Sequence, residues 1–143
     1  MRKAVIIMVS AALLCCWSGV FAHAVTFPVN VKGTWEGTLR VAVGTTFVTT
    51  PMTLKITSQS GPLFLGNVTF PPPYSDGNPS AFNGALFDDQ FRVTDGKHVV
   101  AGGRLNLFNP AVPLMEGYVH QLESTDQPEQ TGVFSLKKTS NTF

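Results

Sequence analysis

The chain has 143 residues, 13% of them charged, and a formal net charge of +1, which is the size of one domain with a single hydrophobic core. The few charges are spread along the sequence, so no basic or acidic cluster indicates a nucleic acid or an anionic membrane surface as partner. Composition therefore excludes the charge-driven binding proteins and leaves the individual ligand or partner open.

The first 24 residues have the three parts of a secretory signal peptide. Arg2 and Lys3 form a positive n-region, and residues 4–17 are an apolar run that is too short to span a bilayer comfortably. Residues 22–24, Ala-His-Ala, form a small-x-small cleavage site. We therefore expect an exported protein, periplasmic or extracellular, that begins at Val25.

Both cysteines precede this cleavage site. Cys15 and Cys16 would be removed with the signal peptide, so residues 25–143 would hold no disulfide and no thiolate metal ligand. Without Arg2 and Lys3, eight of the ten basic residues remain against nine acidic ones. We expect residues 25–143 to be a single domain that its core alone stabilises.

Apolar and polar residues alternate with period two along this domain, and no stretch has a sustained helical period. In the clearest case Trp35, Leu39 and Val41 share one face while Glu36 and Arg40 share the other. Together with the turn residues between them, the patterns predict eight strands: residues 33–43, 52–57, 63–70, 81–87, 90–94, 97–108, 114–122 and 131–138.

Eight short strands without a helix to cover a sheet edge favour a closed antiparallel up-and-down β-barrel, with a β-sandwich as the alternative. Glycine recurs at inward positions, where it either permits the tight coiling of a small barrel or leaves a cavity. The glycines are Gly37, Gly66, Gly84, Gly103 and Gly117. The aromatic residues that could fill the space are Trp35, Phe64, Phe70, Phe82, Phe91 and Phe134.

Gly33-Thr34-Trp35 on the first strand resembles the Gly-x-Trp opening of the avidin and lipocalin branches of the calycin barrels. In those families a basic residue of the last strand packs across the tryptophan and closes the barrel, which implies this role for Lys137 or Lys138. An amphipathic lysine stem over an indole combines apolar packing with cation–π attraction. With Trp35 as the single tryptophan after cleavage, the resemblance implies the fold and argues against biotin as ligand.

The same patterns predict two hairpins and the face on which a set of polar side chains lies. Asp95-Gly96 predicts a two-residue type I′ turn. A loop at residues 109–113 would place Arg104 opposite Tyr118 and His120 opposite Gly102. The polar side chains of this hairpin would then lie on the solvated outer wall rather than form a metal site: His98, Arg104, Glu116, Tyr118 and His120.

The most unusual loop joins the third and fourth predicted strands. Its three consecutive prolines favour an extended polyproline II conformation that displays Tyr74. The loop is either a recognition arm over the barrel mouth or a rigid connector. We expect the ligand or partner to contact Phe70, Pro72, Tyr74 and Phe82.

No residue pattern supports catalysis. The adjacent Asp88 and Asp89 predict a turn rather than a catalytic pair, and no nucleophile, phosphate-binding or zinc motif is present. We expect no cofactor, no metal and no membrane span. The sequence favours a non-catalytic barrel that binds a small apolar or amphipathic ligand. The alternatives are a protein-interaction module, such as a secreted inhibitor or surface accessory protein, and a cyclase-like enzyme.

Overall fold

The computed structural model describes residues 29–72, 77–109, 111–123 and 128–141, so the expected signal peptide and Tyr74 lie outside it. Within these ranges every regular element is a strand, and no helix could cross a membrane. The strands are β1 Gly33–Val43, β2 Thr46–Ser60, β3 Leu63–Thr69, β4 Ser80–Phe87, β5 Gln90–Thr94, β6 Val99–Asn106, β7 Leu114–Gln121 and β8 Gln130–Ser140.

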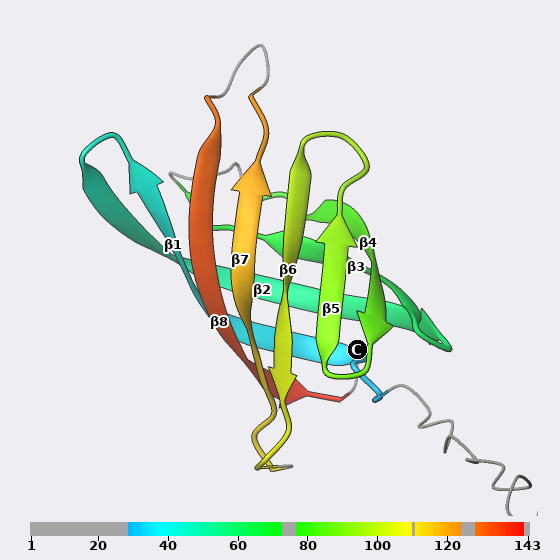
Figure 1. Cartoon of the computed structure of the whole chain (residues 1–143). Coiled ribbons are helices and arrows are strands. Elements are labelled where there is room, and N and C mark those ends of the chain that lie inside the picture. The colour runs from blue at the N-terminus through cyan, green and yellow to red at the C-terminus, as the bar shows by residue number, and fades with distance from the viewer. Residues whose placement is uncertain (1–28, 73–76, 110, 124–127, 142–143) are drawn as a thin grey trace, which may run out of the picture.

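Each strand pairs antiparallel with its neighbours in the sequence, and β8 pairs with β1, so the sheet closes (Figure 1). In this view β5 to β8 form the near wall, and β2 and β3 cross behind them. Closure leaves no unpaired sheet edge. The predicted eight-stranded up-and-down barrel is therefore confirmed, and the alternative of a β-sandwich is wrong.

The connection between β5 and β6 differs from the predicted two-residue turn. One carboxylate oxygen of Asp95, Oδ1, accepts hydrogen bonds from the backbone N–H groups of Lys97, His98 and Val99 at 2.8, 2.9 and 2.9 Å. In this turn only Gly96 has a positive φ, of 75°, whereas a type I′ turn needs positive φ at both central residues. The type I′ prediction was wrong because the Asp95 side chain organises a longer turn around itself.

The β6–β7 register is displaced by two positions from the predicted one. Arg104 faces Glu116 and Gly102 faces Tyr118, so the predicted pairs of Arg104 with Tyr118 and of His120 with Gly102 were wrong. The loop between these strands spans residues 107–113 and is centred one residue earlier than expected. Because the displacement is even, the side chains within β6 and β7 stay on their predicted faces.

One end of the barrel is closed around Trp35, which is only 1% exposed. Its indole N–H donates to the Val31 carbonyl at 2.9 Å. Lys138, beside Trp35 on β8, places Nζ 5.7 Å from the ring centroid and donates to the Asn30 carbonyl at 3.2 Å. Burial lowers the pKa of Lys138. Lys137 is exposed, so of the two lysines it is Lys138 that covers the indole.

The backbone at this closed end needs glycine at position 33. Gly33 has a φ of 130°, and the carbonyl of Ser140 on β8 occupies the place that a Cβ would take. The side chain of Gln59 then holds the preceding segment, since it accepts from the Val31 N–H and donates to the Val29 carbonyl, both at 2.9 Å. Residues 29–32 therefore form a plug across the end of the barrel.

Two interior glycines make room for aromatic rings. A Cβ at Gly84 would collide with the ring of Phe64, and a Cβ at Gly66 would collide with the ring of Phe82. The two rings pack edge to face with their centroids 6.2 Å apart. At these two positions glycine therefore serves tight packing, and any cavity must lie elsewhere in the barrel.

Candidate functional site

Two adjoining cavities lie at the end of the barrel opposite Trp35, which we call the open end. The turns at residues 44–45 and 95–98 lie there, together with the end of β3, the start of β4, the end of β7 and the start of β8. Figure 1 shows the β5–β6 turn at this end, on the upper side of the view. Alternation of strand direction places these connections at one end and the remaining turns at the other.

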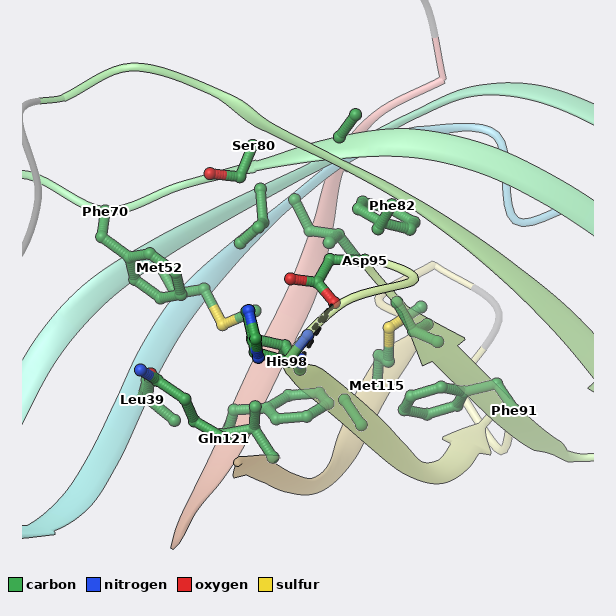
Figure 2. Close-up of a pocket in the computed structure, with 18 residues that line it drawn as sticks. Leu39, Met52, Phe70, Ser80, Phe82, Phe91, Asp95, His98, Met115 and Gln121 are labelled. Atoms are coloured by element: carbon green, nitrogen blue, oxygen red, sulfur yellow. Dashed lines mark hydrogen bonds between the residues drawn. The ribbon is translucent and has the colours of Figure 1, made fainter. Parts of the chain in front are cut away.

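A cavity of about 440 Å³ opens at this end, and every strand contributes to its wall (Figure 2). Most of the lining is aliphatic, aromatic or thioether surface, because inward positions near the ends of the strands carry these side chains. The apolar lining residues are Leu39, Met52, Leu54, Val68, Phe70, Ala81, Phe82, Phe91, Val93, Val99, Ala101, Met115, Val119 and Phe134.

A second space of about 500 Å³ adjoins the first and extends along the β1–β2 hairpin. Its additional wall comes from Val41, Val43, Val48 and Thr50 of that hairpin and from Gln130 and Gly132 of β8. Five residues line both spaces, namely Leu39, Phe70, Val99, Val119 and Gln121. We treat the two spaces together as the open-end cavity.

Polar side chains are few in the open-end cavity. Ser80, Asp95, His98 and Gln121 line the first space, and Thr50 and Gln130 join Gln121 in the second. Thr50 is buried within β2. The other polar side chains come from the ends of strands or from the turn at residues 95–98 at the open end. The cavity is therefore amphipathic, with an apolar body and a polar rim.

Among the described lining residues Asp95 is the single carboxylate, and its pKa lies below the usual value of 3.8. Partial burial acts in the opposite direction and raises the pKa. The hydrogen bonds from the backbone of Val99, Lys97 and His98, together with the charge interaction with His98, outweigh burial. Bonds to the ionised form favour it, so Asp95 carries a negative charge at neutral pH.

The structure brings together only part of the predicted ligand-binding set. Phe70 and Phe82 both line the cavity, Phe70 from the beginning of the proline loop and Phe82 from β4. Pro72 is exposed and lines neither space, and Tyr74 lies outside the described residues.

His98 is the clearest error among the predicted positions. Strand alternation placed it on the outer wall, but it lines the cavity beside Asp95 (Figure 2). The alternation of faces applies only within a strand, and β6 begins at Val99. His98 belongs to the turn that Asp95 organises. In a turn, side chains do not alternate between two faces as they do in a strand.

The other members of that polar set lie on the outer wall, as expected. Arg104, Glu116 and Tyr118 are exposed there, and His120 lies 3.0 Å from the Thr131 hydroxyl and 3.3 Å from the Glu129 carboxylate. Among the described residues no three His, Cys, Asp or Glu side chains come together as a metal site. Asp88 and Asp89 form the β4–β5 turn at the closed end.

Sequence reasoning missed several cavity residues, above all Leu39, Met52, Val119 and Asp95. The first three are inward positions in the half of each strand nearest the open end. Combining the predicted alternation with the direction of each strand would have grouped them. The role of Asp95 had no such signal, since it depends on the conformation of its turn.

No known protein-family model matches this chain, and no curated protein is detectably similar to it. The barrel and its cavity are therefore the basis for a functional argument, and the calycin resemblance stays a prediction.

Proposed function

We propose that this protein is an exported β-barrel that binds a small apolar or amphipathic molecule in the open-end cavity without chemically changing it. The main support is the cavity of about 440 Å³ with apolar walls that opens opposite the Trp35 end. Small-molecule sites are typically about 300–1,000 Å³, mostly apolar, with a few polar groups that set orientation. Export is supported by the signal-peptide pattern of residues 1–24.

The two ends of the barrel differ in how their apolar side chains are used. Trp35, Ile56, Phe64 and Leu136 are buried toward the closed end and stabilise the fold. The open end keeps apolar surface that a ligand could remove from water, at about 25 cal/mol per Å² buried. Affinity should therefore come mainly from the apolar body of the ligand, and orientation from the rim.

A substitution that fills the cavity tests this proposal. Val119 lines both spaces, so Val119→Trp would occupy the region where they meet. Binding would be followed with N-phenyl-1-naphthylamine, a neutral apolar dye that fluoresces in apolar sites. We expect Val119→Trp to weaken dye binding by about tenfold or more, because the indole displaces the ligand and overpacks the wall.

The neighbouring residue gives a matched control. Tyr118 precedes Val119 on β7 but is 49% exposed on the outer wall, so Tyr118→Trp adds an indole without entering the cavity. We expect its dye affinity to equal that of the unmodified protein, with circular dichroism showing that both variants are folded. Equal binding by folded Val119→Trp and Tyr118→Trp would move the site away from the cavity.

A further inference from the structure

Few acidic or basic side chains are found among the described residues that line the open-end cavity. Among the described residues that line its two spaces, Asp95 is the only acidic side chain, and no lysine or arginine is present. His98 is the only other titratable side chain in the lining. Among these lining residues the Asp95 carboxylate therefore meets no lysine or arginine that would offset its charge.

The geometry of the turn leaves part of this charge available. All three backbone hydrogen bonds to Asp95 end on Oδ1. Figure 2 shows the other carboxylate oxygen, Oδ2, directed away from these bonds and into the cavity. The backbone N–H of Asp95 also donates to the Val99 carbonyl at 3.3 Å, which closes the turn. The carboxylate is thus held in a fixed orientation before any ligand arrives.

We infer that the ligand of the open-end cavity has a cationic head, such as a protonated amine, attached to an apolar body. This inference rests on the proposed function and specifies its ligand class. The apolar body lies against Leu39, Met52 and Phe134, and the ammonium group lies at the rim, where it donates a hydrogen bond to Oδ2 of Asp95. The uncharged rim groups of Ser80 and Gln121 accept further hydrogen bonds.

A ligand with an anionic head fits the same cavity poorly. A carboxylate at the rim would lie near Asp95 with no lysine or arginine of the lining to offset the repulsion. Like charges in a partly desolvated site disfavour each other, and opposite charges form hydrogen bonds about twice as strong as neutral ones. An uncharged alcohol has neither the repulsion nor the attraction and should lie between the two.

Three ligands with the same ten-carbon chain test this order: decylamine, decan-1-ol and decanoate. Their affinities for the purified protein would be measured by isothermal titration calorimetry at pH 7, below the concentrations at which they form micelles. We expect decylamine to bind about tenfold or more tighter than decanoate, with decanol between them.

Two matched charge changes assign the preference to Asp95. Asp95→Asn keeps an oxygen that can accept the backbone hydrogen bonds but removes the charge, so the preference for the amine over the alcohol should disappear. Glu129→Gln removes a charge that contacts His120 and lines neither space of the cavity, and it should leave the preference unchanged. If Asp95→Asn does not fold, the order of affinities in the unmodified protein still decides.

The outcomes separate this inference from the proposed function. Binding of decanoate as tight as that of decylamine would overturn the cationic head while the cavity remained the binding site. A preference for the amine that persists in folded Asp95→Asn would also overturn it. Failure of all three ligands and of the neutral dye to bind would contradict the proposed function itself.

Discussion

Trp35 and Lys138 show how two side chains close one end of this barrel. The indole fills the interior and satisfies its N–H with the Val31 carbonyl. Lys138 holds its ammonium nitrogen 5.7 Å from the ring centroid and donates from it to the Asn30 carbonyl. A long amphipathic side chain can thus cover apolar surface and keep a hydrogen-bonded charge.

Truncation of Trp35 should therefore be costly. We expect Trp35→Ala to lower the free energy of unfolding by about 3–5 kcal/mol, the usual cost of removing a large aromatic side chain from a core. A denaturant titration would measure it. Phe108, which is fully exposed in the β6–β7 connection, gives the control: Phe108→Ala should change stability by less than about 0.5 kcal/mol. Equal effects of the two truncations would contradict the closed-end packing.

Strands were the most predictable elements, because alternation identifies them wherever one face is buried. β1 and β5 begin and end at the predicted residues, and the other strands overlap their predicted ranges. β2 is longer than expected and begins at Thr46. The residues before Met52 pair with residues 38–43 of β1. Closure followed from the number of strands and the absence of a covering helix.

The elements that failed depend on side-chain detail. The β6–β7 register could not be fixed, because a displacement of two residues leaves the alternation unchanged. The prediction of a type I′ turn between β5 and β6 was wrong because three backbone hydrogen bonds to Asp95 determine the conformation of this turn. Whether inward glycines leave a cavity depends on which rings reach them. Phe64 and Phe82 reach Gly84 and Gly66, and the space remains nearer the open end.

The interior of the barrel is packed around Trp35 at one end and hollow at the other. Closure around Trp35 and Lys138 stabilises the fold, while the open end presents apolar walls and the Asp95 turn. Buried core residues such as Phe91 and Phe134 also line the cavity, so a substitution meant to change binding more than folding belongs at a partly buried lining position such as Val119.

Export would deliver this barrel without its first 24 residues. We expect the exported protein to begin at Val25, because Ala22 and Ala24 provide the small residues that signal peptidases require. N-terminal sequencing of the protein recovered outside the cytoplasm measures this directly. Recovery of an exported form that still begins at Met1 would show that the apolar segment is not a cleaved signal.

Binding inside the barrel is the central claim, and nuclear Overhauser effects between a bound ligand and the methyl groups of the protein test it most directly. With N-phenyl-1-naphthylamine as ligand, we predict contacts from its aromatic protons to the methyl groups of Leu39, Met52 and Val119, which line the cavity. Contacts confined to Leu65 and Val133, which are exposed on the outer wall, would contradict a binding site in the cavity.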